Sequence, residues 1–191
     1  MYPAEIFRDT LSRLIGILSS FGIRFHLTGG ITSIAYGEPR MTQDIDIVVD
    51  NAAIARTLEA FIAAATQAGF MLDEAGVRRA VADRSMFQLF DMAEALKIDI
   101  YPREMIPGEL DRSGMLEVFE GMMVPVVSRP DAAASKLVRA SKGSHKSRRD
   151  LRQIARHMPI ADRDELDRLA GRLGFDDLLS EILVEPDEIA G

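Results

Sequence analysis

The fold is decided by residues Thr28–Val49, TGGITSIAYGEPRMTQDIDIVV. A short strand is expected over Arg24–Thr28, and it runs directly into the pair Gly29-Gly30. Ile31–Tyr36 then predicts a helical turn, and the β-branched run Gln43–Val49 predicts a second strand after a loop. Strand, glycine turn, helix and strand in this order are typical of a mixed α/β arrangement.

Outward from this stretch, the hydrophobic spacing predicts a helix over residues 4–20 and a long alanine-rich helix over Asn51–Ala68, capped by Asp50. Four further strands are expected, at Phe70–Asp73, Ser85–Phe90, Leu96–Tyr101 and Met122–Val127. After Pro130 the patterns are helical, at Asp131–Ser141, Ser147–His157, Asp162–Leu173 and Phe175–Leu183. The predicted fold is therefore α+β, a mixed sheet flanked by helices in residues 1–129 and a helical C-terminal subdomain in residues 130–191.

The composition is that of an ordinary globular protein. The 191 residues are 47% hydrophobic and include no cysteine, so we expect no disulfide framework and favour a cytoplasmic location. No apolar run approaches the length of a membrane span, and we expect no membrane association. The histidines are scattered without the spacing of a zinc site, and neither a P-loop nor a Gly-x-Ser-x-Gly motif is present.

Charge is distributed unevenly along the chain. The net charge of −7 argues against a polyanionic partner, but residues 131–156 hold eight basic and two acidic side chains, a local charge of +6. Residues 161–191 hold ten acidic side chains and three arginines, which accounts for the whole negative excess. A basic segment beside an acidic tail is compatible with a polyanionic substrate.

Three aspartates are the candidate catalytic and metal-binding residues. Alternate side chains of a strand share one face, so Asp44 and Asp46 point away from Ile45. Two carboxylates on one face repel each other unless a cation lies between them, and Mg²⁺ usually takes one or two carboxylates together with substrate phosphates. Asp99, flanked by isoleucines in another predicted strand, repeats the pattern. Three such carboxylates would suit a two-metal phosphoryl or nucleotidyl transfer, although each alone could be the polar outer face of a strand.

The glycine pair is the candidate phosphate-binding turn. Gly29 and Gly30 lie where a strand turns into a helix, where backbone N–H groups and the helix dipole can receive a triphosphate. Thr32 and Ser33 could add hydroxyl donors, and Arg40 could contact phosphate or be an exposed loop residue. A glycine pair by itself is more often a plain turn, so its value depends on the aspartates that follow it.

These motifs resemble the signature of the DNA-polymerase-β-type nucleotidyltransferase superfamily, most closely its AbiEii-like, toxin-related branch. The resemblance lies in Gly29-Gly30, Tyr36-Gly37, Arg40, Thr42 and Asp44-Ile45-Asp46. It implies that the glycine turn binds the triphosphate, that the aspartate pair binds two Mg²⁺ ions, and that Asp99 completes the site. Gly30 departs from the pattern, since many members carry Ser there.

The resemblance extends into the helical part. Pro130-Asp131, Ala134, Lys136-Leu137 and Ala140 are similar to the branch's lysine-bearing helix, and Arg149-Asp150 resembles the pair that opens the next helix. It implies that Lys136 contacts nucleotide phosphate and that Arg149 and Asp150 form a second wall of the nucleotide site.

The basic segment from Lys142 to Asp150 has two interpretations. It could be a solvated loop in which Ser147 and Asp150 form a capping box for the next helix. Against this, Arg148 and Arg149 would then lie in the first helical turn, where the helix dipole disfavours cations. The second interpretation is that the segment guides a triphosphate or an RNA backbone.

Three functions remain open at this point. The first is a Mg²⁺-dependent enzyme that transfers a nucleoside monophosphate from an NTP, ATP among the candidates, to an acceptor hydroxyl such as that of a tRNA, with a cognate antitoxin protein as a possible partner. The second is nucleotidylation of a small molecule, as in aminoglycoside-modifying enzymes. The third is a nucleotide-binding or toxin–antitoxin module without turnover. The basic segment favours RNA, whereas the neutral charge of residues 1–160 favours a small molecule.

Overall fold

The computed structural model describes residues 4–36 and 44–186. Its contacts divide them into two compact units, residues 4–31 with 44–127 and residues 32–36 with 128–186, here called the sheet unit and the helical unit. Within the described residues, no helix is both long and apolar enough to span a bilayer.

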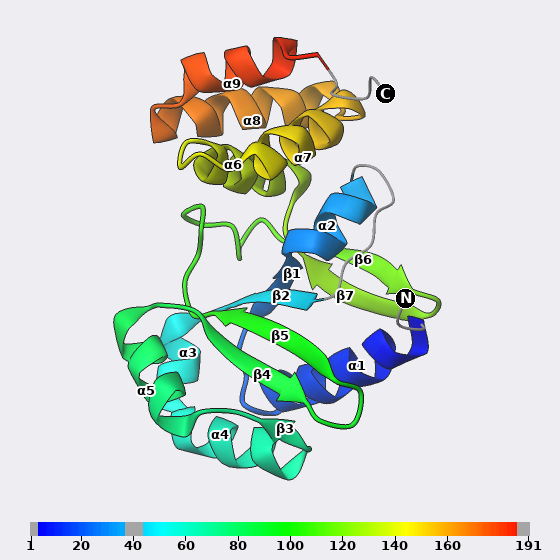
Figure 1. The fold of residues 1–191 in the computed structure, drawn as a ribbon, viewed down its shortest axis with the longest axis vertical. Helices are drawn as coiled ribbons and strands as arrows, with labels where there is room; N and C mark the ends of the chain where they lie inside the picture. Colours follow the sequence, from blue (N-terminus) through cyan, green and yellow to red (C-terminus); the bar gives the residue numbers. More distant parts are fainter. Residues whose placement is uncertain (1–3, 37–43, 187–191) are drawn as a thin grey trace. The chain divides into compact units, whose positions relative to one another are not determined.

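The sheet unit is built on a mixed seven-stranded sheet in the order β3-β4-β5-β2-β1-β7-β6 (Figure 1). The strands are β1 Phe25–Thr28, β2 Asp44–Val49, β3 Phe70–Met71, β4 Phe87–Asp91, β5 Leu96–Tyr101, β6 Gly114–Phe119 and β7 Met122–Val126. β2 is the central strand, antiparallel to β1 and parallel to β5. The predicted α+β class with a mixed sheet is confirmed.

The helices that accompany the sheet are α1 Ala4–Ser20, α3 Asn51–Arg56, α4 Leu58–Gln67 and α5 Glu74–Asp83. α1 buries Leu11, Leu14 and Leu18 completely, at the spacing of one helix face. On β2 and β5 the isoleucines Ile45, Ile47, Ile98 and Ile100 are also fully buried. These strands therefore carry their aspartates on the face opposite the isoleucines.

The predicted helix over Asn51–Ala68 is wrong in its continuity, because the chain breaks at Thr57 into α3 and α4. The Thr57 hydroxyl donates a hydrogen bond to the Ala53 carbonyl, 3.0 Å away, and the Thr57 N–H bonds to the Ile54 carbonyl, so the helical ladder is interrupted. The predicted cap is confirmed, since the Asp50 carboxylate accepts from the Ala53 N–H at 3.0 Å.

Two elements were not predicted. α5 buries Val77, Ala80 and Val81 at helical spacing, but its apolar face is short and interrupted by arginines. β6 lies at the sheet edge, and its side chains are exposed or half-buried, so it lacks the alternation that reveals a strand.

The helical unit holds α6 Arg129–Ala140, α7 His145–Arg156, α8 Ile160–Leu173 and α9 Asp176–Val184, together with the end of α2, Gly29–Tyr36. α6 packs on α7 and α8, and α9 contacts the same two helices (Figure 1). Ser128 is the N-cap of α6, where its hydroxyl accepts from the Asp131 N–H, and Pro130 lies in the first turn. The guanidinium of Arg129 lies 5.1 Å from the ring centre of Tyr36, which holds the end of α2 to α6.

Candidate active site

Asp46 and Asp99 face each other across two neighbouring parallel strands. The register of β2 and β5 places Asp46 opposite Asp99 and Asp44 opposite Lys97. Adjacent strands lie about 4.8 Å apart, so the carboxylates of Asp46 and Asp99 are neighbours on one face of the sheet. Asp46 is 9% exposed and Asp99 6%, whereas the side chain of Asp44 is 39% exposed. The site therefore has two sheltered carboxylates and a third nearer to solvent.

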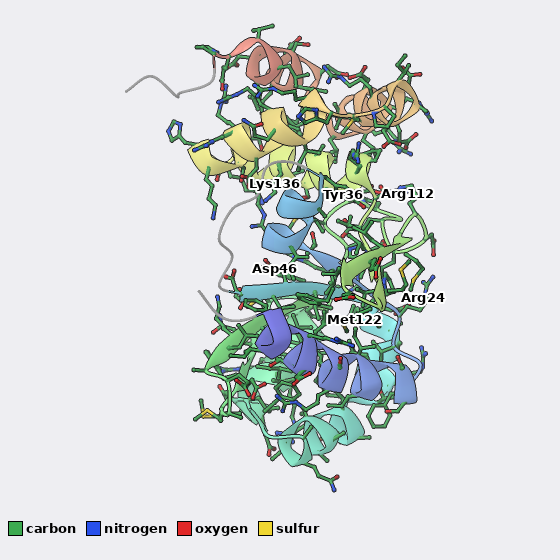
Figure 2. All side chains as sticks on the ribbon, turned by 90° about the vertical axis from the view of Figure 1, so that its right-hand side faces the viewer. Arg24, Tyr36, Asp46, Arg112, Met122 and Lys136 are labelled. Atoms are coloured by element: carbon green, nitrogen blue, oxygen red, sulfur yellow. The ribbon has the colours of Figure 1, made fainter. Side chains whose placement is uncertain are left out.

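The glycine turn lies against the first of these carboxylates. Helix α2 begins at Gly29 itself, two residues earlier than predicted, and the N–H of Gly30 lies 3.4 Å from Oδ2 of Asp46 (Asp46 is labelled in Figure 2). Gly29 has φ of +69°, and a Cβ added there would lie 1.9 Å from the same oxygen. Only glycine fits this position, because both the backbone conformation and the close approach of Asp46 exclude a side chain.

Replacing Gly29 with alanine is expected to lower the free energy of unfolding by more than the backbone strain alone, which is about 1–2 kcal/mol. The added methyl group must also displace the Asp46 carboxylate. Gly22→Ala is the matched control, because Gly22 has φ of +63° but no atom within 4 Å of its Cβ position. Urea unfolding measures both variants. Equal losses in the two would show that the contact with Asp46 is unimportant for stability.

Three further side chains hold the carboxylates in place. Tyr101 donates its hydroxyl to Oδ1 of Asp46 at 3.2 Å, and the Gln88 amide donates to Oδ1 of Asp99 at 2.9 Å. The ammonium of Lys97 lies 3.0 Å from Oδ2 of Asp99 and 3.3 Å from Oδ2 of Asp44. The hydrogen bond to Asp99 is the main reason that the pKa of Lys97 is raised, so the ammonium stays charged at neutral pH.

Lys97, Gln88 and Tyr101 were missed by the sequence analysis. The signal for two of them is simple, since Lys97 and Tyr101 stand two residues before and after Asp99 and must share its face of β5. Gln88 lies opposite Asp99 in the register of β4 and β5, which no local pattern reveals.

Metal binding is constrained by Lys97. Within residues 4–36 and 44–186, no three His, Cys, Asp or Glu side chains converge as a metal site. The positive charge between Asp44 and Asp99 is instead supplied by the Lys97 ammonium. The donor chemistry still fits Mg²⁺, which prefers carboxylate oxygens and usually takes only one or two from the protein. Asp46 and Asp99 are the pair that could provide them.

The remaining predicted nucleotide-binding residues lie on helices of the structure or outside its described residues. Thr32 is 1% exposed in α2, and Ser33 lies in the next position of that helix. Lys136, on α6, pairs its ammonium with Oδ2 of Asp150 on α7 at 2.9 Å, and Arg149 is exposed on α7. Arg40 lies outside the described residues. The structure thus brings the glycine pair together with the three aspartates in the sheet unit, and Lys136 together with Asp150 in the helical unit.

The predicted capping box of Ser147 and Asp150 is wrong. α7 begins earlier, and Ser144 is its N-cap, with a hydroxyl that accepts from the Ser147 N–H. Ser147 and Asp150 are consequently buried inside the helix, where Asp150 binds Lys136. Arg148, the fourth residue of α7, ends the first turn, and Arg149 lies beyond it. The Arg148 guanidinium binds Glu181 and Glu185 of the acidic C-terminal region.

Comparisons with known proteins agree with this arrangement. A family model described as nucleotidyl transferase AbiEii toxin, type IV TA system, matches residues 13–180. No curated protein sequence matches the chain. Among solved structures, an antigenic nucleotidyltransferase-like protein from Paracoccidioides brasiliensis superposes with a TM-score of 0.53 at 16% identity, covering 94% of this chain and 93% of that one. The antibiotic-resistance factor ANT(2'')-Ia superposes with a TM-score of 0.52 at 13% identity, covering 96% and 91%.

The two solved structures share the fold at low sequence identity, and the family model covers most of the chain. The predicted resemblance to the AbiEii-like branch is confirmed, as is the enzyme class. The chain belongs to the AbiEii family of nucleotidyl transferases.

Proposed function

We propose that this enzyme transfers a nucleoside monophosphate from an NTP to an acceptor hydroxyl with Mg²⁺ at Asp44, Asp46 and Asp99. The observation that carries the proposal is the pairing of Asp46 with Asp99 across β2 and β5, beside a glycine turn whose first residue has no room for a Cβ. A ligand-binding turn and two sheltered carboxylates within one compact unit suit phosphoryl chemistry better than a structural role.

Each group has a defined task in this proposal. The acceptor oxygen attacks the α-phosphorus, the bond from that phosphorus to the bridging oxygen breaks, and pyrophosphate leaves. Asp99 receives the hydroxyl proton, and the start of α2 at Gly29 and Gly30 receives the triphosphate. Bound Mg²⁺ would supply positive charge to the phosphate oxygens, held by the carboxylates of Asp46 and Asp99 with Asp44 as the outer ligand.

Lys97 bears on the concentration of Mg²⁺ that the enzyme needs. Its ammonium neutralises Asp44 and Asp99, so it competes with a cation for their oxygens. Lys97→Met is expected to lower the half-saturating Mg²⁺ concentration about fivefold, the equivalent of about 1 kcal/mol for a partly exposed ion pair. Pyrophosphate release measured across a Mg²⁺ titration tests this. Lys142→Met, an exposed lysine of the helical unit, is the control. A higher Mg²⁺ requirement in Lys97→Met would contradict competition.

We propose an RNA acceptor, such as a tRNA 3′ end. The support is the charge of +6 over residues 131–156, which run from α6 through α7, since a cluster of cations favours a phosphate backbone. The family description names a type IV toxin–antitoxin system, so a cognate antitoxin is the proposed protein partner. A cytoplasmic location belongs to the same proposal and rests on the absence of cysteine.

A small-molecule acceptor is the second candidate. Its support is that residues 1–160 carry no net charge and that the fold is shared with an antibiotic-resistance factor. The acceptors are distinguished by incubating the protein with Mg²⁺, each α-labelled NTP in turn, and either total tRNA or a panel of aminoglycosides. Label in tRNA supports the RNA acceptor, and label in an aminoglycoside supports the second candidate. No pyrophosphate release under any condition would favour a binding module without turnover.

A further inference from the structure

The helical unit contains a pocket of about 580 Å³ between α7 and α9. Four cationic side chains line it, all from α7, and two carboxylates face them from the end of α9: Lys146, Arg148, Arg149, Arg152, Glu181 and Glu185. Positive charge is therefore in excess in the pocket by two. None of these residues belongs to the carboxylate site of the sheet unit.

The two carboxylates are bound to the arginines of α7. The Nε of Arg148 donates to Glu185 at 2.8 Å, and its terminal nitrogen contacts both Glu185 and Glu181. Arg152, whose side chain is 9% exposed, pairs with the other oxygen of Glu185. The guanidinium of Arg148 lowers the pKa of Glu185, so this carboxylate is charged at neutral pH. The planar guanidinium groups thus already hold two anionic groups in the manner that suits phosphate.

Both helices oppose this charge pattern locally. Arg148 lies in the first turn of α7, where the dipole disfavours cations, and that turn holds no acidic residue. Glu181 and Glu185 lie one turn apart at the C-terminal end of α9, where the dipole disfavours anions and like charges repel each other. The dipole of each helix, taken alone, therefore disfavours these charged residues at these positions. The positions of the arginines and of the glutamates are both explained if the arginines bind an external anion and the glutamates occupy the position of that anion when it is absent.

Part of the cationic surface stays open. Lys146 and Arg149 are exposed at the pocket, and neither forms an ion pair with a described residue. The N-terminus of α7, a helix of 12 residues, lies beside them and adds its own positive potential. An elongated polyanion could therefore meet Lys146 and Arg149 first and reach Arg148 and Arg152 only after the glutamates withdraw.

We propose that this pocket binds phosphate groups of an RNA backbone, and that Glu181 and Glu185 occupy the arginines until RNA displaces them. The inference rests on the RNA acceptor of the proposed function. It adds a binding site for the RNA backbone and two carboxylates that compete with RNA for the arginines and so weaken its binding. No covalent bond changes in this displacement. Each arginine loses its ion pair with a carboxylate, forms an ion pair with a phosphate and stays positively charged.

The test measures RNA binding without NTP or Mg²⁺, by fluorescence anisotropy of labelled tRNA over a range of salt concentrations. Glu181→Gln together with Glu185→Gln is expected to tighten binding about tenfold, because it removes the two carboxylate charges that compete with RNA for Arg148 and Arg152. Asp164→Asn with Asp167→Asn is the matched control, because it removes two negative charges from exposed positions of α8. Equal tightening in both double variants would overturn the displacement, since net charge alone would then explain it.

The opposite change tests the site itself. Arg148→Gln with Arg152→Gln is expected to weaken tRNA binding about tenfold and to reduce the salt dependence by more than one unit of slope. Because Arg152 is buried, Lys146→Gln serves as a second variant at an exposed position, with an expected loss of about one unit of slope. An unchanged slope in Lys146→Gln and in a folded double arginine variant would overturn the site.

A free triphosphate offers the same phosphate chemistry, so ATP is titrated in parallel. If the glutamate variant gains affinity for ATP and none for tRNA, the RNA assignment is overturned and the occupant is a free nucleotide. A gain for neither ligand overturns the proposal entirely. These outcomes concern binding alone, and nucleotidyl transfer at Asp46 is assayed separately with pyrophosphate release, so each proposal fails independently of the other.

Discussion

Asp46→Asn is expected to lower nucleotidyl transfer about a thousandfold or more while the protein stays folded. Asparagine keeps the size of the side chain and its ability to accept from Tyr101, but removes the negative charge that would hold Mg²⁺. Losing about 4 kcal/mol of transition-state stabilisation corresponds to a thousandfold in rate. Pyrophosphate release under saturating NTP and Mg²⁺ measures the effect.

The stability of Asp46→Asn is expected to change far less than its activity. Asp46 shares its face with Asp44 and Asp99, and the Lys97 ammonium lies between the carboxylates of Asp44 and Asp99. Removing one charge relieves repulsion with the other two carboxylates, but the asparagine side chain can no longer accept from both Tyr101 and the N–H of Gly30. The free energy of unfolding is therefore expected to change by no more than about 1 kcal/mol.

Asp50→Asn is the control for Asp46→Asn, since it makes the same substitution at the end of β2, where asparagine caps α3 as well as aspartate does. Its transfer rate should stay within about twofold of the wild type, because Asp50 contacts Ala53 and Arg24 rather than the site. Wild-type rates in both Asp46→Asn and Asp99→Asn would show that the carboxylates are not catalytic.

The sequence was most informative where a local rule decides the geometry. Strand alternation predicted that Asp44 and Asp46 share one face of their strand. The flanking isoleucines predicted that Asp99 lies on the polar face of its own strand. The register that places Asp46 opposite Asp99 could not be predicted, because α3, α4, α5 and two strands separate β2 from β5 in the chain. The ion pair of Lys97 with Asp44 depends on that same register.

The start of α7 shows a second limit. Ser144 and Ser147 are both favoured N-cap residues, so a local capping preference does not distinguish between them. The choice is made by another helix, because Lys136 of α6 draws Asp150 into the interior and fixes it within α7. Edge strand β6 shows a third limit, since without a buried face it leaves no periodic signal.

Lys136→Met or Asp150→Asn is expected to lower the free energy of unfolding by about 3–5 kcal/mol, because either change leaves one member of a buried ion pair with its partner charge removed. The two side chains are only 7% and 10% exposed, and their 2.9 Å contact joins α6 to α7. Urea unfolding followed by circular dichroism measures the loss, with the exposed Lys142→Met as the control, for which a change within about 0.5 kcal/mol is expected.

The double variant Lys136→Met, Asp150→Leu separates a structural role from the predicted role in binding nucleotide phosphate. Replacing both charges with apolar groups leaves no charge of the pair buried without its partner, so stability should recover to within about 1–2 kcal/mol of the wild type. If Lys136 also contacts the NTP, the recovered protein will still bind ATP at least about tenfold more weakly in a calorimetric titration. Wild-type affinity in the folded double variant would limit Lys136 to joining the two helices, and a wild-type unfolding free energy in the single variants would contradict the buried pair.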